Sequence, residues 1–506
     1  MLAKINSLTI WGIEGYPVDV EVDISFGVPS ISIVGLPDQA VKESRDRIKP
    51  AIKNSSFEFP SDRKVVINLA PADLKKEGAY FDLPVAIGIL AAEGVVPLNR
   101  VGEFCFVGEL ALDGTLRPVK GILPIAIKLS EMFIKKIALP VDNAKEAAIV
   151  KDIEVYPVKN LRECVGFLTG EKAIERAECD VEALFNSKRK YSLDFKDVKG
   201  QSYAKRAIEV AVAGGHNILM IGSPGAGKTM LASRIPSILP ALILSEALEI
   251  TKIHSVAGIL KEDLVTERPF RAPHHTISDI ALIGGGNIPK PGEVSLAHNG
   301  VLFLDELPEF HRDVLEVLRQ PLEDGKVNIS RAKGRMVFPA RFLMVASMNP
   351  CPCGWYGDSA RQCHCTLSQI LKYRRKISGP LLDRIDIHIE VSSLPAGLLL
   401  REREEEPSER IRERVERARK IQEKRFEGEG IFFNGHMTTG QIKKYCCLDE
   451  ECRELLRSAL EKMQLSARAY DRIRKVARTI ADLDNSDTIK PQHLAEAIQY
   501  RSLDRI

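Results

Sequence analysis

The sequence predicts an α/β fold in which a P-loop NTPase domain is preceded by an α+β domain and followed by a helical lid. Two observations predict the centre of this fold. An apolar strand at residues 217–221 leads through a glycine-rich turn into a helix, and a second apolar strand at 301–304 ends in two carboxylates. A third observation, the helical spacing of apolar residues beyond residue 401, predicts the lid.

Length and composition favour a protein of several domains. A chain of 506 residues is long for one hydrophobic core, so we expect about three domains. No apolar run reaches membrane-spanning length and the N-terminus lacks the apolar core of a secretory signal, so we expect a cytoplasmic protein with no membrane partner. The net charge of +3 does not by itself predict nucleic-acid binding, so DNA contact would require a local patch or a ring of subunits.

Residues 1–170 are predicted to form the first domain. The runs 30–36 and 64–69 are apolar and strand-like, whereas 40–53 and 83–94 have helical spacing. These runs predict one α/β domain in which the order of strands and helices is mixed.

Three further segments complete the predicted organisation. The charged segment 171–190 is predicted to be a linker, and residues 191–395 the nucleotide-binding core, with a helix at 204–213 just before the first strand. Residues 396–506 are predicted to form the C-terminal helical lid.

The turn after the first strand has the form G-x-x-x-x-G-K-T, which is a phosphate-binding loop. Its glycines keep side chains away so that backbone N–H groups can reach phosphate oxygens. Lys228 can then reach the β- and γ-phosphates of ATP, and Thr229 can offer its hydroxyl to Mg²⁺. The residues predicted to hold the nucleotide are Gly222, Ser223, Pro224, Gly225, Ala226, Gly227, Lys228 and Thr229.

Two further strands contribute polar residues at their carboxyl ends, where ligands collect in open α/β sheets. Asp305 and Glu306 follow the strand at 301–304 and form a Walker B signature. We expect Asp305 to hold Mg²⁺ through water, and Glu306 to orient and deprotonate the attacking water. Asn349 follows the next strand, where its amide can hold the same water.

Two loops between these strands are predicted to be insertions on the sheet, at 268–275 and 282–292. Arg271, His274, His275 and Lys290 lie in them and are candidates for phosphate contacts, although solvent-facing loop residues without function are equally common. The basic run 372–376 can contact DNA, contact a neighbouring subunit or form a solvent-facing side of a helix.

Cys351, Cys353, Cys363 and Cys365 form a C-x-C, nine residues, C-x-C pattern. Four thiolates in two pairs suit tetrahedral Zn²⁺, but the one-residue spacing is tighter than the usual two. A loop of reduced thiols is the alternative, and His364 can replace one cysteine as a ligand.

The C-terminal region is predicted to be helical. Residues 401–425 are rich in Glu and Arg with a narrow apolar stripe, which is typical of a lid helix or spacer. Further helices are predicted at 448–463, 467–483 and 492–502. Cys446, Cys447 and Cys452 lack a complete metal pattern and are interpreted as buried thiols.

Two segments of the first domain, 71–83 and 107–123, resemble the proteolytic domain of Lon proteases, which has a ribosomal S5 domain 2-like fold. In that family a serine and a lysine form the catalytic dyad, and this chain has Tyr80 and Leu123 at those places. Neither can act as the nucleophile or its base. The resemblance therefore implies a Lon-like scaffold without peptidase activity, used for packing, assembly or DNA contact.

The motifs together resemble AAA+ ATPases of the magnesium-chelatase-like group, and specifically the YifB/ComM family. The match covers almost the whole chain, from the Lon-like domain to residues 466–470. It implies a homo-oligomeric ring, expected to be a hexamer, with Asn349 as sensor 1, Arg384 as the finger that reaches a neighbour's nucleotide, and Arg468 as sensor 2. An arginine supplied across an interface can raise hydrolysis by ~10³–10⁵, so activity is expected to depend on assembly.

The resemblance also implies an ATP-driven motor on single-stranded or branched DNA, a helicase that drives branch migration in recombination and natural transformation. The alternative is a chelatase-type or chaperone-type remodeller of a protein partner. We expect the Lon-like domain to be absent from chelatase motor subunits, which argues against this alternative. ATP-dependent proteolysis is disfavoured by Tyr80 and Leu123.

Overall fold

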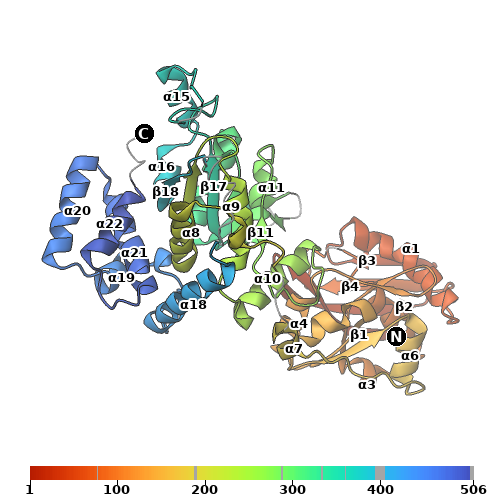
Figure 1. Cartoon of the computed structure of the whole chain (residues 1–506). Helices are drawn as coiled ribbons and strands as arrows, with labels where there is room; N and C mark the ends of the chain where they lie inside the picture. The colour runs from red at the N-terminus through yellow and green to blue at the C-terminus, as the bar shows by residue number, and fades with distance from the viewer. Residues whose placement is uncertain are drawn as a thin grey trace. The chain divides into compact units, whose positions relative to one another are not determined.

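A computed structural model of the chain describes residues 1–73, 75–76, 78–186, 191–286, 289–331, 334–358, 361–393 and 405–501. The end of the predicted linker, Asn287 and Ile288 of the second loop, the beginning of the predicted lid and its last residues lie outside this part. By their internal contacts the residues fall into two units, Met1–Ser187 with Ala247–Thr266, and Lys188–Glu246 with Glu267–Ile506. Figure 1 shows the elements of both.

The first unit is built on a mixed seven-stranded sheet in the order β3-β4-β2-β1-β5-β8-β9. Its strands are β1 (Leu2–Trp11), β2 (Glu14–Ser25), β3 (Ser30–Val34), β4 (Lys64–Ala70), β5 (Phe104–Phe106), β8 (Lys136–Pro140) and β9 (Glu154–Val158), and β6 (Glu109–Leu110) and β7 (Leu116–Arg117) form a separate hairpin. The helices are α1 (Gln39–Asn54), α2 (Asp82–Ala92), α3 (Leu98–Val101), α4 (Ile122–Ser130), α5 (Ala144–Ala148), α6 (Leu161–Thr169) and α7 (Val181–Asn186).

Helix α2 forms the centre of this unit because every one of its residues is buried. It packs against β1 and β2, and in β2 the alternating residues Val18, Val20 and Val22 are buried. The predicted helices at 40–53 and 83–94 correspond to α1 and α2, and the predicted strands to β3 and β4.

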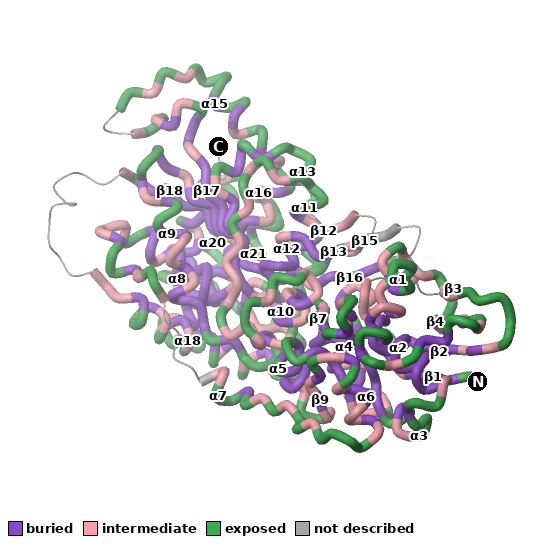
Figure 2. Tube along the Cα trace, turned by 90° about the vertical axis from the view of Figure 1, so that its right-hand side faces the viewer, coloured by how far each residue is buried: buried purple, intermediate pink, exposed green. Residues whose placement is uncertain are grey.

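The second unit contains a parallel five-stranded sheet in the order β11-β14-β17-β10-β18. Its strands are β10 (Ile218–Ile221), β11 (Phe270–Arg271), β14 (Val301–Leu304), β17 (Leu343–Met348) and β18 (Ile387–Glu390). The helices α8 (Ser202–Gly214) and α9 (Lys228–Arg234) pack on it (Figure 1). Strand β17 is buried along its whole length (Figure 2).

Further helices and short strands lie in the connections between these strands. They are α10 (Leu244–Ala257), α11 (Asp279–Ile283), β12 (Gly284–Gly285), β13 (Lys290–Pro291), α12 (Glu293–Leu296), α13 (Arg312–Glu316), α14 (Arg319–Asp324), β15 (Lys326–Arg331), β16 (Gly334–Pro339), α15 (Leu367–Arg374) and α16 (Gly379–Leu382). In Figure 2 much of α15 is exposed.

The register of the parallel strands places the candidate site. Ile221 at the end of β10 lies opposite Met348 at the end of β17, and Leu304 at the end of β14 lies opposite Ala346. The turns that follow β10, β14 and β17 therefore meet at the same edge of the sheet.

The C-terminal helices share one hydrophobic core with this sheet. They are α18 (Ser408–Arg425), α19 (Thr439–Tyr445), α20 (Glu450–Met463), α21 (Ala467–Leu483) and α22 (Pro491–Gln499). Both α18 and α21 contact α8. In the part of the chain that the structure describes, no helix is both long and apolar enough to cross a bilayer.

Two features differ from the sequence-based expectations. Residues 247–266, predicted to be part of the nucleotide-binding core, belong by their contacts to the first unit, where Ser255 Oγ donates a short hydrogen bond to Glu146. Phe270 and Arg271, predicted to lie in an inserted loop, form the edge strand β11. Both differences come from long-range pairing, which local hydrophobic periodicity does not report.

A buried ionic network joins the C-terminal helices and yields a stability prediction. The Asp482 carboxylate is 0% exposed and accepts from Arg425 at 2.5 Å, Arg478 at 3.0 Å and Asn434 at 2.8 Å. Asp482→Ala leaves two guanidinium groups without their buried partner, so we expect it to lower the free energy of unfolding by about 3–5 kcal/mol. The measurement is urea denaturation followed by circular dichroism.

The matched control is Glu450→Ala, which removes an exposed carboxylate that pairs with Arg453 at 3.4 Å, and it should leave the urea midpoint unchanged. Equal midpoints for the two variants would show that the network does not stabilise the fold.

Candidate nucleotide-binding site

The phosphate loop joins β10 to α9, and its glycines serve two different purposes. Gly225 and Gly227 have φ values of 79° and 94°, in the left-handed region that favours glycine. Gly222 is required by close packing instead, because a Cβ atom there would lie 2.2 Å from the carbonyl oxygen of Val391. The loop is thus open at its tip and fixed against the end of β18 at its base.

Lys228 is enclosed by this loop. Its Nζ donates to the carbonyl oxygens of Gly222 at 2.6 Å and Ser223 at 3.0 Å, and to Asn349 Oδ1 at 3.2 Å. Burial lowers the pKa of the Lys228 ammonium, and the nearby carboxylates of Asp305 and Glu306 act in the opposite direction. A desolvated cation beside an open glycine loop fits the binding of a phosphate group.

Asp305 connects the loop to the second strand of the site. Thr229 Oγ1 donates to Asp305 Oδ2 at 2.8 Å, while Ser347 Oγ and the Glu306 N–H donate to Asp305 Oδ1. Hydroxyl and carboxylate oxygens are ligands that Mg²⁺ prefers, so Thr229 and Asp305 fit an Mg²⁺ site. Ser347 was not predicted, although a serine in an otherwise apolar buried strand is a usable signal because it requires a partner.

Glu306 adopts an unusual backbone conformation beside this carboxylate. Its φ is 53°, a left-handed conformation that is uncommon for a residue other than glycine. Its side chain is 56% exposed, and its Oε2 lies 3.7 Å from His275 Nδ1. The His275 ring lies against that of His274, with 4.1 Å between centroids and an angle of 34° between the ring planes. His275 was predicted as a phosphate contact of a loop, and the structure brings it to the Walker B glutamate.

The structure brings together Lys228, Thr229, Asp305 and Asn349, but places the two predicted arginines elsewhere. Arg384 follows α16 and forms an ion pair with Glu323, and its side chain is 11% exposed. Arg468 is 61% exposed, with Asp383 at 3.6 Å. Among the described residues, neither arginine has a hydrogen bond or ion pair to the phosphate loop.

The basic residues predicted to contact phosphates are mostly paired within the chain. Arg271 makes a bidentate contact with Glu293 at 2.6 and 2.7 Å. Arg268 begins the same predicted insertion but was not predicted to contact phosphates; its side chain is 6% exposed and pairs with Glu246 at 2.7 Å. In the run 372–376, Tyr373 is buried and Lys376 pairs with Glu309 at 3.2 Å, whereas Lys372 and Arg375 are exposed.

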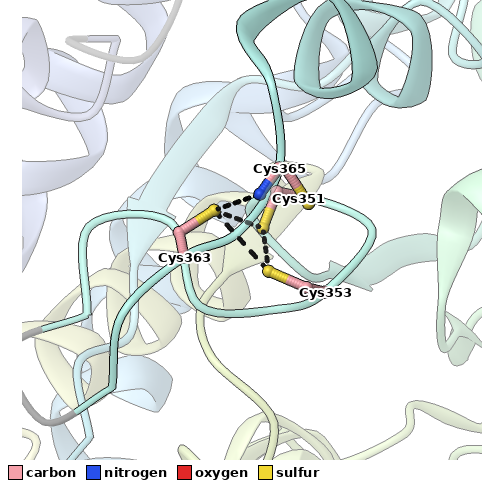
Figure 3. A group of neighbouring side chains, drawn as sticks. All are labelled: Cys351, Cys353, Cys363 and Cys365. Carbon is pink, nitrogen blue, oxygen red and sulfur yellow. Dashed lines mark hydrogen bonds between the residues drawn. The ribbon is translucent and has the colours of Figure 1, made fainter.

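The four cysteines of the C-x-C pairs gather into one cluster after β17 (Figure 3). The Sγ atom of Cys363 lies 3.7 Å from that of Cys351 and 3.6 Å from that of Cys353, and all four sulfurs lie within 4.8 Å of one another. His364 is not part of the cluster. The other cysteine group behaves partly as predicted, because Cys446 and Cys452 are buried but Cys447 is exposed.

Tyr80 and Leu123, which the sequence comparison above placed at the positions of the Lon dyad, both lie in the first unit. Leu123 is 0% exposed at the start of α4, where its N–H donates to Glu146 at 2.9 Å, and Tyr80 is half-buried with its ring packed edge-on to Phe81. Burial raises the pKa of the Glu146 carboxyl. Neither side chain has the chemistry of a serine or lysine.

Three family models match successive parts of the chain. The model described as magnesium chelatase, subunit ChlI, matches residues 194–399, and its C-terminal counterpart matches 405–501. A model described as subunit ChlI of Mg-chelatase matches residues 20–143. The N-terminal domain therefore does not by itself separate the chain from chelatase-like proteins, contrary to the argument made from sequence.

Individual relatives extend the likeness to the whole length. Competence protein ComM of Haemophilus influenzae is 46% identical over 508 residues, which cover 100% of this chain and 98% of the relative. The protein YifB of Escherichia coli is 44% identical, with the same coverage. Lon protease 2 of Bacillus subtilis is 29% identical over 154 residues, which cover 27% of this chain and 26% of the protease.

The structure agrees with these matches, because its parallel sheet carries the phosphate loop and the acidic strand end and is followed by C-terminal helices. The family implies ATP and Mg²⁺ as ligands. The chain belongs to the YifB/ComM family of magnesium-chelatase-like AAA+ proteins.

Proposed function

We propose that this protein is an ATP-hydrolysing ring motor that acts on single-stranded or branched DNA, as a helicase in branch migration during recombination and natural transformation. The observation that carries this proposal is the 46% identity, along the whole chain, to a relative named as a competence protein. The assembled contacts of Lys228, Thr229, Asp305 and Asn349 support the ATPase part.

The geometry of the site supports the proposed roles. The backbone of residues 222–229 and the Lys228 ammonium bind the phosphates, and Thr229 and Asp305 hold Mg²⁺. Bound Mg²⁺ supplies positive charge that offsets the charge developing on the phosphate oxygens. Glu306, exposed and next to Asp305, takes the proton of the attacking water, while the Asn349 amide orients that water.

The two arginines are proposed to act on assembly. Arg384 is now paired with Glu323, so as a finger it must exchange this carboxylate for the phosphates bound by a neighbouring subunit. Arg468 is largely exposed and has only a long contact with Asp383, so it can reorient toward a nucleotide as sensor 2. We further propose that the ring is a hexamer and that the Lon-like domain has no peptidase activity.

The alternative is a chelatase-type or chaperone-type remodeller of a protein partner. It is favoured by the chelatase descriptions of the family models, which together match most of the chain. The two functions differ in the ligand that stimulates hydrolysis.

ATP turnover should rise when single-stranded or four-way-junction DNA is added at low salt, and the gain should decrease as salt increases, because phosphate contacts release counterions. The measurement is steady-state phosphate release with each DNA, together with unwinding of a labelled junction. If no DNA stimulates hydrolysis at low salt, the proposed action on DNA is contradicted. The alternative, a remodeller of a protein partner, then remains.

Glu306→Gln should lower the rate of hydrolysis by about 10²–10⁴, because the amide cannot accept the proton, while nucleotide binding remains. Lys228→Ala should abolish turnover as well. Glu309→Gln is the matched control, since this exposed carboxylate lies three residues away and pairs with Lys376. A Glu306→Gln variant with more than a tenth of the normal rate would contradict the assigned role.

Arg384→Ala should lower hydrolysis by about 10³–10⁵ without loss of nucleotide affinity or assembly, because the arginine serves the neighbouring site. Glu323→Ala, which removes only its partner in the same chain, should keep the activity.

A mixing experiment makes the test sharper. Subunits with Arg384→Ala and subunits with Lys228→Ala are both inactive alone, but in mixed rings the intact loop of one meets the intact arginine of the other. Turnover should reappear on mixing, and its absence in rings shown to be mixed would contradict an arginine supplied across the interface.

A further inference from the structure

The four-cysteine cluster has the dimensions of a metal site. Tetrahedral Zn²⁺ binds thiolates at about 2.3 Å, which places neighbouring sulfurs about 3.8 Å apart. The observed separations are 3.4 Å for Cys351–Cys353, 3.6 Å for Cys353–Cys363 and 3.7 Å for Cys351–Cys363. A disulfide requires about 2.05 Å, so these are free sulfurs, and together with Cys365 they lie within 4.8 Å of one another.

The surrounding segment offers little else to hold its shape. No helix or strand is present among its described residues between β17 and α15. Its two large aromatic side chains stack on arginines instead of forming a core: Trp355 faces Arg361 at 4.4 Å and Tyr356 faces Arg374 at 5.5 Å. The Cys365 N–H points at Cys363 Sγ at 3.4 Å, a contact that supports a metal-bound thiolate.

This segment also contacts the phosphate loop at two points. Asp358 Oδ2 accepts from Ser223 Oγ at 2.6 Å and from Ser393 Oγ at 3.2 Å. Gly354 packs so closely on Pro224 that a Cβ atom there would lie 2.6 Å from the Pro224 ring. Ser223 and Pro224 are both residues of the phosphate loop, so the cysteine segment forms one wall of the nucleotide site.

The chain itself provides a third link. Asn349, which accepts from Lys228 at 3.2 Å, precedes the first cysteine by only two residues. The intervening Pro350 carbonyl is held by Arg374 Nε at 3.1 Å. The position of Cys351 in the cluster therefore restricts the position of Asn349 at the Lys228 ammonium.

We propose that Cys351, Cys353, Cys363 and Cys365 hold a structural zinc ion that orders residues 349–358 and 361–366 against the phosphate loop, so that zinc binding and ATP binding strengthen each other. The inference rests on the proposed binding of ATP at this loop. Asp358 and Gly354 are positioning residues in this scheme: they act on the nucleotide through Ser223 and Pro224. Since such linkage is reciprocal, the factor by which zinc raises ATP affinity is also the factor by which ATP raises zinc affinity.

The first experiment is elemental analysis of full-length protein prepared without chelators. We expect about one zinc per protomer in the wild type, and none in Cys353→Ser combined with Cys363→Ser. The control is Cys447→Ser, which removes an exposed thiol outside the cluster and should leave the zinc content unchanged. A wild-type ratio near zero would overturn the metal site.

The second experiment measures binding of a fluorescent, non-hydrolysable ATP analogue with excess Mg²⁺, before and after removal of zinc by a zinc-selective chelator. We expect a loss of about tenfold in affinity, within the usual range of coupling between sites, and recovery when zinc is returned. In the reverse direction, the analogue should slow zinc release to a chromogenic chelator. Circular dichroism confirms that the zinc-free protein remains folded.

Asp358→Ala separates coupling from metal binding. This variant should keep one zinc per protomer and bind the analogue more weakly, with little further change when zinc is removed. Equal analogue affinity with and without zinc in the wild type would overturn the inference alone. Failure of the zinc-loaded protein to bind the analogue at all would instead contradict the proposed ATP site, and the inference with it.

Discussion

The candidate site depends on the hydrogen bond between Thr229 and Asp305, and that bond depends on the register of three parallel strands. Thr229 and Asp305 lie far apart in the sequence, yet the pairing of β10 and β14 on either side of β17 brings their turns to one edge. The strands are apolar and buried on both faces, as expected for a parallel sheet, so hydrophobic burial holds them together in the sheet. The polar residues at the strand ends are positioned as a consequence.

The parts of the site that could be predicted from sequence are those encoded over short distances. The loop at 222–229 and the pair Asp305–Glu306 each combine a strand, a turn and a characteristic residue set within a few positions. The paired cysteines were also recognisable as a candidate metal site, with a loop of reduced thiols as the alternative. The α/β fold and the helical C-terminus followed from periodicity, which local sequence records directly.

The missed features are set by long-range pairing instead. The strand β11 has only two residues and exists because it pairs with β14, so no periodicity marks it. The assignment of residues 247–266 to the first unit depends on partners such as Glu146, distant in sequence. The contacts of His275 with Glu306 and of Asp358 with Ser223 likewise join segments whose proximity only the folded chain determines.

The close packing of Gly222 on Val391 has a mechanical consequence. Strand β18 is four residues long, with Val391 directly after it and Arg384 shortly before it. This edge strand pairs with β10 alone and spans about 13 Å at ~3.3 Å per residue. In the proposed ring, β18 would link the phosphate loop of one subunit, packed at its end, to Arg384 before its start, the arginine proposed to serve the neighbouring subunit.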